Sequence, residues 1–286
     1  MGVRGAVDAD LLSRADLVAD LRDRCGVGSG DILLIQAALR SIGRVEGGAA
    51  TVVEALREAV GPKGTLVGYA ATPENSETSR YYRTVTGGMG AAELARYRAA
   101  MTPFEQDSTP CSPALGRLSE QLRTTPGALR SSHPQTSFTA LGARAEEVVA
   151  NHPLGSHLGD DSPVGRLYEM GAKALLIGVE DWVCTAYHLA EYRVPWRAVL
   201  EHGCIVADEH GGGGRWVHFK ALDLDDLHFP TMVTAVRKTV DYRIGTLGEA
   251  ETFVLPIAES VDAAVEWLRE NVGPGPMDPF QLASSM

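Results

Sequence analysis

Two apolar runs decide the fold of this chain: Ile32-Leu33-Leu34-Ile35 and Thr65-Leu66-Val67-Gly68-Tyr69. Short, continuously apolar segments of this kind are typical of strands buried on both faces of a parallel sheet. Between the two runs, apolar residues recur with helical spacing from Val52 to Val60, and Gly61-Pro62 ends that helix. The order strand, helix, strand predicts a β-α-β unit, whose crossover should be right-handed.

The pattern of buried strands continues and then changes along the chain. A third apolar run, Ala174-Leu175-Leu176-Ile177-Gly178-Val179, leads into an apparent helix. Beyond Tyr192, residues 198–207 and 215–222 read as antiparallel strands joined by a turn at 211–214. We therefore expect an α/β fold with a mixed, largely parallel central sheet flanked by helices, and an antiparallel C-terminal portion.

Shorter signals place the remaining elements and the limits of the domain. Strands are expected near residues 128–132 and 138–141. Capping residues and periodicity predict further helices near residues 13–25, 113–122, 143–150, 163–170, 229–240 and 260–271. The whole chain, 1–286, is expected to form a single domain, with a core of about residues 13–272. The Gly-, Pro- and Ser-containing end, 273–286, is expected to be a loosely held tail.

The overall composition excludes several classes of protein. Of 286 residues, 44% are hydrophobic, which is enough for a globular core, and the formal net charge of −11 opposes binding to nucleic acid. No run approaches the roughly 20 apolar residues that span a bilayer, and residues 1–10 show no targeting pattern. The four cysteines form no CxxC pair, so reduced thiols are expected. We expect a soluble, cytoplasmic protein with no nucleic-acid or membrane partner.

A long polar segment interrupts this regular pattern. Residues 72–109 are punctuated by glycine and proline and are weakly periodic, with one helix expected around residues 91–100. Connections of this length inside compact domains are usually functional or mobile. We interpret this segment as an excursion that covers a site.

His188 and Glu191 are the candidate catalytic pair. They stand three residues apart at the start of the helix that follows the third strand, and positions i and i+3 share a helix face. A histidine that is neutral near pH 7 and oriented by a carboxylate can take a proton from a nucleophile. The alternative is a helix-start histidine beside a solvated glutamate, and spacing alone does not decide between the two.

The loop Leu39–Gly48 is a second candidate, because it leaves a strand end and brings backbone amides close to a helix N-terminus, where they can hold an oxyanion or a phosphate. A plain connection between strand and helix is the alternative. No GxSxG elbow or Walker-type phosphate loop is present. A metal site would draw on the histidines and carboxylates of this region, but their spacing matches no standard zinc pattern, so no metal is expected. The candidate ligands are His152, His157, Asp160, Asp161, His188 and Glu191. The histidines at 202, 210, 218 and 228 are expected at the surface.

Several ordered blocks of the sequence resemble the aminoglycoside 3-N-acetyltransferase family, whose fold differs from that of the GNAT acetyltransferases. The resemblance covers about residues 13–270, and the set of blocks in this order is specific. The blocks are Gly30-Asp31-Ile32-Leu33-Leu34-Ile35, Leu39-Arg40-Ser41-Ile42-Gly43, Gly47-Gly48-Ala49-Ala50-Thr51-Val52-Val53, Val60-Gly61-Pro62-Lys63-Gly64-Thr65-Leu66, Arg130-Ser131-Ser132-His133-Pro134, Gly159-Asp160-Asp161-Ser162-Pro163 and Tyr187-His188-Leu189-Ala190-Glu191.

The resemblance implies transfer of an acetyl group from acetyl-CoA to an amine of an aminoglycoside, without a metal. It implies that His188 is the catalytic base and that Glu191 accompanies it. It also implies a set of residues around the CoA site: Ala37, Ala38, Leu39, Arg40, Ser41, Ile42, Gly43, His133, Ser137 and Ser162.

The chain also departs from the family pattern. Family members usually carry His and Ser where this chain has Gln36 and Ala38, and an Asp where it has Trp182; Asp181, one position earlier, is a candidate replacement. These changes suggest a less cationic or more aromatic acceptor. The candidate acceptor-binding residues are Gln36, Tyr69, Glu105, Asp107, Asp160, Asp161, Asp181 and Trp182.

The sequence therefore predicts an acetyl-CoA-dependent N-acetyltransferase that acts on an aminoglycoside or a related amino-sugar compound. Its partner would be a small-molecule amine, expected to be cationic, and a homodimer is left open. Two alternatives are kept. One is a biosynthetic acyltransferase acting on an unrelated amine or hydroxyl, and the other is a homologue that binds CoA or a drug with little turnover.

Overall fold

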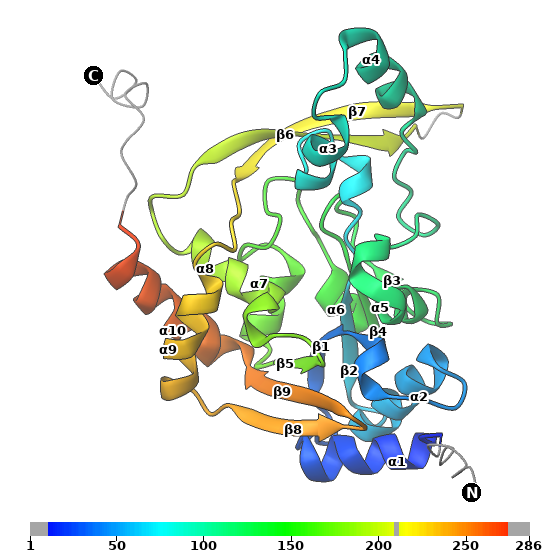
Figure 1. Ribbon diagram of the computed structural model, residues 1–286, viewed down its shortest axis with the longest axis vertical. Helices are drawn as coiled ribbons and strands as arrows, with labels where there is room; N and C mark the ends of the chain where they lie inside the picture. Colours follow the sequence, from blue (N-terminus) through cyan, green and yellow to red (C-terminus); the bar gives the residue numbers. More distant parts are fainter. Residues whose placement is uncertain (1–10, 209–211, 274–286) are drawn as a thin grey trace, which may run out of the picture.

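A seven-stranded sheet forms the centre of the molecule (Figure 1). The computed structural model describes residues 11–208 and 212–273, so residues 1–10, the turn residue Gly211 and most of the expected tail lie outside the described residues. The strand order is β3-β4-β2-β1-β5-β9-β8. The bounds are β1 Ile32–Ala37, β2 Thr65–Tyr69, β3 Leu129–Arg130, β4 Phe138–Gly142, β5 Lys173–Ile177, β8 Arg243–Leu247 and β9 Ala250–Pro256.

The three apolar runs form the parallel middle of this sheet, as predicted. β1 pairs in parallel with β2 and with β5, and Ile32 stands opposite Thr65. The four outer pairings are antiparallel, which makes β3 and β8 point the same way as the central strands. The expected mixed, largely parallel sheet is confirmed. The sequence did not predict β8 and β9, which turn at Gly248 (φ +58°) and close one edge of the sheet.

Helices cover both faces of the sheet. On one face lie α1 and α2 with α5, and on the other lie α6 to α10, so alternate residues of each central strand enter different clusters. Leu34 and Leu176 belong to one cluster, while Leu33 and Leu175 belong to the other. The bounds are α1 Arg14–Ala19, α2 Ala49–Val60, α5 Gly116–Arg123, α6 Ala145–Val149, α7 Pro163–Glu169, α8 His188–Tyr192, α9 Phe229–Thr239 and α10 Ile257–Asn271.

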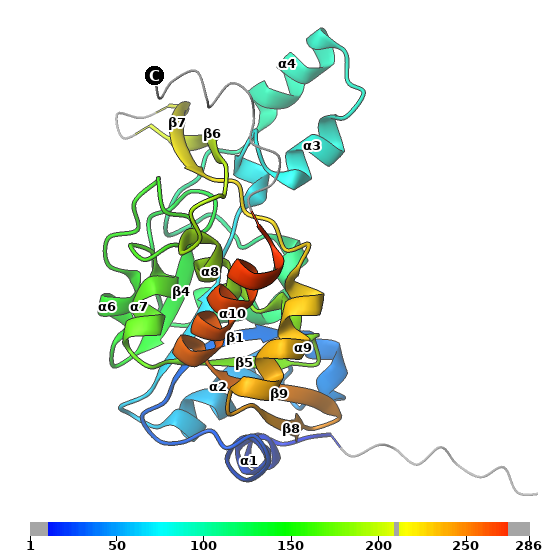
Figure 2. The same ribbon diagram turned by 90° about the vertical axis from the view of Figure 1, so that its left-hand side faces the viewer.

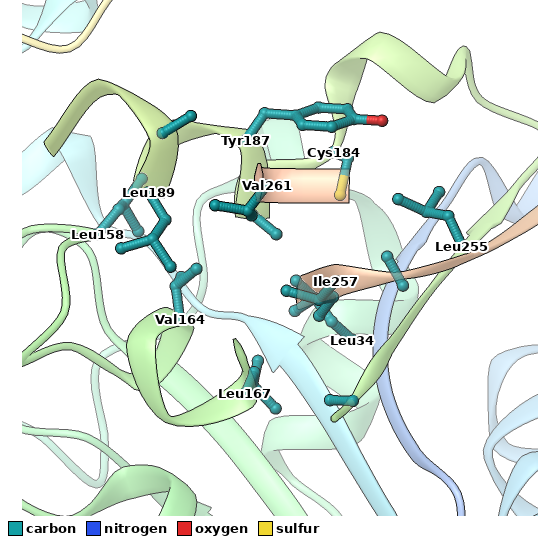
Figure 3. Packing of buried hydrophobic residues seen from close by; sticks show 14 of the residues in the cluster. Leu34, Leu158, Val164, Leu167, Cys184, Tyr187, Leu189, Leu255, Ile257 and Val261 are labelled. Carbon is teal, nitrogen blue, oxygen red and sulfur yellow. The ribbon is translucent and has the colours of Figure 1, made fainter. Parts of the chain in front are cut away.

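The face that carries α7, α8 and α10 holds the larger buried cluster (Figure 3). Ile257 and Val261 of α10 pack against Leu34 of the sheet and against Tyr187, which directly precedes α8. All three apolar side chains and the Tyr187 ring are fully buried. This packing fixes the start of α8 relative to the end of the sheet.

A second, two-stranded sheet lies with the excursion at one end of the molecule (Figures 1 and 2). It consists of β6 Val199–Ala207 and β7 Gly214–Leu222, close to the predicted bounds. The excursion carries α3 Arg80–Thr86, which was not predicted, and α4 Ala91–Ala100, which was. Two isolated bridges, Ser76 to Cys204 and Phe104 to Val206, join the excursion to the hairpin.

The two ends of the excursion meet beside β2. The Ser112 amide donates a hydrogen bond of 2.9 Å to the carbonyl of Ala71, so the chain leaves and returns at one point. Arg130 reinforces this closure from β3, since its guanidinium donates to the carbonyls of Ala70 and Thr109. In the part of the chain described here, no helix is long and apolar enough to cross a membrane.

Candidate active site

A cleft of about 220 Å³ opens between the carboxyl ends of the central strands and the excursion. Tyr69 at the end of β2 and His188 at the start of α8 both line it. Ligand sites in open α/β sheets lie at this edge, where neighbouring parallel strands end together. The cleft therefore brings together Tyr69 and His188, which the sequence had assigned to the acceptor and to catalysis.

His188 and Glu191 form a close pair within α8. His188 Nδ1 lies 2.5 Å from Glu191 Oε2, as the three-residue spacing predicted. The His188 side chain keeps 20% of its surface exposed, whereas that of Glu191 keeps only 2%. A carboxylate accepts hydrogen bonds and cannot donate them, so His188 Nδ1 carries the proton and donates a hydrogen bond to Glu191. The lone pair of Nε2 is then free to accept a proton.

The other carboxylate oxygen of Glu191 is held by two groups that the sequence analysis did not single out. Glu191 Oε1 accepts a hydrogen bond of 3.1 Å from the Asp225 amide and forms an ion pair with Arg197. These two contacts hold the carboxylate in place behind the imidazole. Arg197 and Asp225 lie far enough along the chain that no local spacing pointed to them.

The imidazole of His188 is neutral at pH 7. Burial of the ring lowers the pKa of His188 to about 4, and the nearby positive charge of Arg197 acts in the same direction, against Asp226. A neutral imidazole is the form that accepts a proton. The pair is therefore in the protonation state required of a general base.

Packing and hydrogen bonds around α8 hold this pair in place. Cys184, Tyr187 and Leu189 on either side of His188 point into the buried cluster (Figure 3). Gln36, at the end of β1, fixes the preceding loop: its side-chain amide donates to the Val183 carbonyl (2.9 Å) and accepts from the Thr185 amide (2.8 Å). The structure thus places Gln36 behind the loop that precedes His188, with both ends of its amide engaged by backbone.

The loop after β1, predicted to contact CoA, lies next to the loop after β5. Ala37 pairs with Ile177, and the Ala38 amide donates to the Ile177 carbonyl (2.9 Å). A short 3-10 helix follows, Leu39–Ile42, with Arg40 exposed and Ile42 buried. The helix ends at Gly43, whose φ of +95° is favourable only for glycine. Ser41 contacts the Gly178 carbonyl (3.4 Å).

The other three residues assigned to the CoA site are fully buried and bonded within the protein. His133 Nδ1 accepts from the amides of Gln135 and Thr136, both at 3.1 Å, and its Nε2 donates to the Leu154 carbonyl. Ser137 donates to the Ala70 carbonyl. Ser162 caps α7 by accepting from the Val164 amide. In this structure these side chains stabilise the turns around the cleft.

The predicted acceptor-binding carboxylates lie outside the cleft lining. Asp181 is 1% exposed, and its carboxylate is bound by Arg237 and Tyr242. Asp160 is exposed and pairs with Arg193 at 2.7 Å. Glu105, Asp107 and Asp161 are exposed elsewhere, and Trp182 is half-buried against the larger cluster. Of the acceptor residues suggested by the sequence, only Tyr69 lines the cleft with His188.

The cleft contains charged and imidazole groups that sequence reasoning missed. Arg80 and Arg83 of α3 and Asp223 and Asp226 after β7 line it. His157 and His202 line it too, and their rings pack edge to face with centroids 4.6 Å apart. The expectation that His202 is a surface residue was wrong: it is 9% exposed because its ring stacks on Phe219, which was not visible in the sequence. His210 lies outside the described residues.

The candidate metal ligands do not assemble into a site within residues 11–208 and 212–273. There, no three His, Cys, Asp or Glu side chains lie close enough together to hold an ion. The absence of a metal from the reaction stays a prediction.

Together these features define a class of protein: an α/β enzyme with a histidine–carboxylate pair at the end of a mixed sheet. Comparison with known proteins gives the family. The model of the aminoglycoside 3-N-acetyltransferases matches residues 34–269, and the chain belongs to this family. It is therefore an acyltransferase.

Relatives agree over nearly the whole chain. An aminoglycoside N(3)-acetyltransferase III from Salmonella sp is 34% identical over 274 residues, covering 91% of this chain and 93% of the relative. The crystal structure of YokD protein from Bacillus subtilis superimposes with a TM-score of 0.85 at 29% identity, covering 92% and 95% of the two chains. A structure described as AAC-IIIb with CoASH gives a TM-score of 0.79 at 31% identity, covering 93% and 100%.

Proposed function

We propose that the protein transfers an acetyl group from acetyl-CoA to an amine of an aminoglycoside or a related amino-sugar compound, with His188 as the general base. The observation that carries the proposal is the pair itself: a neutral imidazole, held through Nδ1 by a buried carboxylate, lines a cleft at the end of the sheet. The names of two relatives support this choice of substrates: one is an aminoglycoside N(3)-acetyltransferase, and another was solved with CoASH.

The chemistry follows from the demands of acyl transfer. An ammonium group must lose a proton before its nitrogen can attack a thioester carbonyl. That first proton passes to solvent. As the C–N bond forms and the C–S bond breaks, His188 Nε2 accepts a second proton from the same nitrogen, and the imidazolium then returns it to the leaving thiolate. Glu191 stabilises the imidazolium during the transfer. The products are the N-acetylated amine and CoA in its thiol form.

The cofactor end of the site is assigned by the same proposal. Acetyl-CoA would approach along the loop Ala37–Gly43, which begins where β1 and β5 end side by side. Backbone amides at the start of the Leu39–Ile42 helix are our candidates for stabilising negative charge on the thioester oxygen.

A thiol-release assay tests the proposal. Purified protein with acetyl-CoA and a panel of amino sugars and aminoglycosides should release CoA, and mass spectrometry should show an added acetyl group on the amine. Replacing His188 by Ala should lower kcat by about 10²- to 10⁴-fold, the usual contribution of a general base.

The matched control is His218→Ala, because His218 lies on β7 with 48% of its side chain exposed. This variant should keep wild-type activity. Turnover of no amine by the wild-type protein would contradict the function, and full activity of His188→Ala would contradict the role of His188.

A second candidate function is acyl transfer in biosynthesis to an amine or hydroxyl outside the aminoglycosides. The placement of Asp181 and Asp160 favours it, because neither carboxylate lines the cleft. Relative kcat/KM values across the amine panel separate the two candidates.

A further inference from the structure

The charges around the acceptor cleft differ from what a polycationic molecule requires. Such a molecule is bound by several carboxylates, whereas this lining contains two arginines, Arg80 and Arg83, and two aspartates, Asp223 and Asp226. Asp226 is engaged by Arg80 at 3.4 Å. The formal charge of these four groups is zero.

Arg83 is the unpaired cation of this lining. It is exposed on α3, and no carboxylate within the described part of the chain forms an ion pair with it. A guanidinium presents a planar set of donors that matches a carboxylate or phosphate in two parallel hydrogen bonds. Asp223, also exposed in the lining, can attract an ammonium group at the same time. One free cation and one exposed carboxylate are complementary to a zwitterion.

His157, which lines the cleft, provides a hydrogen-bond acceptor that carries no charge. Burial lowers the pKa of His157 well below its ordinary value, so the ring is neutral. The Thr136 hydroxyl donates to the His157 carbonyl (3.2 Å), so its oxygen accepts from His157 Nδ1 (3.3 Å). That assignment leaves Nε2 of His157 as an acceptor, and it is buried without a hydrogen-bond partner. The wall beside His188 therefore adds a neutral ring and no charge to the cleft.

The size of the cleft limits the molecule it can enclose. Its volume of about 220 Å³ lies below the range of about 300–1,000 Å³ that is typical of pockets for drug-sized ligands. One ring with its substituents fits within this volume, and a larger acceptor would extend out of the open side of the cleft.

From these observations we infer that the acceptor is a small amine that also carries an acidic group, and that Arg83 binds the acidic group. This inference rests on the proposed acyl transfer and specifies its acceptor. Arg83 is a specificity-determining residue in this assignment, and His188 remains the base.

Steady-state kinetics on matched acceptors tests the inference. The probes are glucosamine, glucosamine 6-phosphate and kanamycin A, each with acetyl-CoA. The wild-type protein should show its highest kcat/KM with glucosamine 6-phosphate. Arg83→Gln should lower that kcat/KM by about 10- to 100-fold, as expected for a hydrogen-bonded charge, and change the value for glucosamine by less than about threefold.

The matched control is Arg96→Gln, since Arg96 is exposed on α4 and is absent from the cleft lining. It should leave all three acceptors unchanged. A wild-type preference for glucosamine or kanamycin A, or an equal effect of Arg83→Gln on both glucosamine compounds, would overturn the inference. So would a rise in the KM of acetyl-CoA alone, because Arg83 would then bind a phosphate of CoA.

Calorimetry separates this inference from the proposed function. If the wild-type protein acetylates none of the three amines, the function fails, and binding of glucosamine 6-phosphate to the CoA-saturated protein decides the inference by itself. Binding that is at least about tenfold weaker in Arg83→Gln supports it. No detectable binding, or equal binding by both proteins, refutes it.

Discussion

The sheet end that carries His188 and the excursion that covers it are built in opposite ways. The sheet end is apolar and closely packed: α10 alone buries Ile257, Val261, Ala264 and three further side chains against it. In the excursion, α4 buries no residue at all, and α3 buries only Tyr82.

This difference in packing suits two different tasks at the site. A base must keep its orientation to a fraction of an ångström, and a dense core supplies that rigidity. Charged side chains that select an acceptor need access to water, and a thin polar layer supplies it. Under the proposed function, the proton transfer belongs to the sheet end, and Arg83 of the excursion contributes to the choice of acceptor.

The largest effect should come from removing core packing under the sheet end. Leu34→Ala, at a fully buried position, should lower the free energy of unfolding by about 2–5 kcal/mol. Leu94→Ala, at a half-buried position of α4, should cost about 1 kcal/mol or less. Urea unfolding followed by circular dichroism measures both. Equal losses of unfolding free energy in the two variants would contradict the difference in packing between the two regions.

The second effect concerns the carboxylate behind the base. Glu191→Gln keeps the shape of the side chain but removes the charge that stabilises the imidazolium. We expect kcat to fall by about 10- to 100-fold, less than for His188→Ala. Stopped assays at saturating acceptor measure it, with circular dichroism as the check on folding. An unchanged kcat would show that Glu191 only positions the helix.

The third prediction concerns the boundary between the two regions, where histidine rings pack against one another. His133 packs against His152 and His157 at 4.8 Å in each case. Burial lowers the pKa of His133 to about 3 and that of His152 to about 4, and lowers that of His157 as well. An unfolded histidine has a pKa of about 6.5, so the unfolded chain takes up protons first as the pH falls.

The contribution of the neutral histidines to the free energy of unfolding should be complete above about pH 6.5 and should be lost between about pH 6.5 and pH 3, by up to about 1.4 kcal/mol per pH unit for each histidine. Urea midpoints across this range measure the slope. His133→Asn retains an acceptor for the two amides and should reduce the slope. A midpoint independent of pH would show that the buried histidines are not held neutral.

The smallest effect is expected on the exposed face of the excursion. Arg96→Ala on α4 should change the free energy of unfolding by less than about 0.5 kcal/mol and leave kcat unchanged. The same assays apply. A large loss of activity would mean that α4 contributes to the chemistry, against the division described above.

The elements that the sequence predicted are those whose signals are local. The runs around Leu34, Leu66 and Leu175 are apolar because both faces of the sheet are covered, so their burial was visible in the sequence. β8 was missed because it is an edge strand with Arg243 and Ile244 exposed, so it lacks an apolar run. The contact between His188 and Glu191 follows from helix geometry and was predicted correctly.

The rest of the site depends on contacts between distant parts of the chain. Asp181 looked like a free carboxylate, but Arg237, 56 positions later, binds it in the fold. Arg83 reaches the cleft only because α3 lies over the sheet end beside the hairpin (Figure 2). No spacing rule in one sequence contains such pairings. The scaffold and the contact between His188 and Glu191 were therefore predictable, whereas the other groups that line the cleft were not.

The hydrogen bond between Ser112 and Ala71 closes the segment between them into a loop. Its two ends are already adjacent, and lengthening a flexible closed loop twofold costs only about 0.6 kcal/mol in entropy. The paired strands β1, β2 and β5 lie outside this loop. A change of length at its exposed turns is therefore expected to alter the cover of the cleft while the sheet keeps its register.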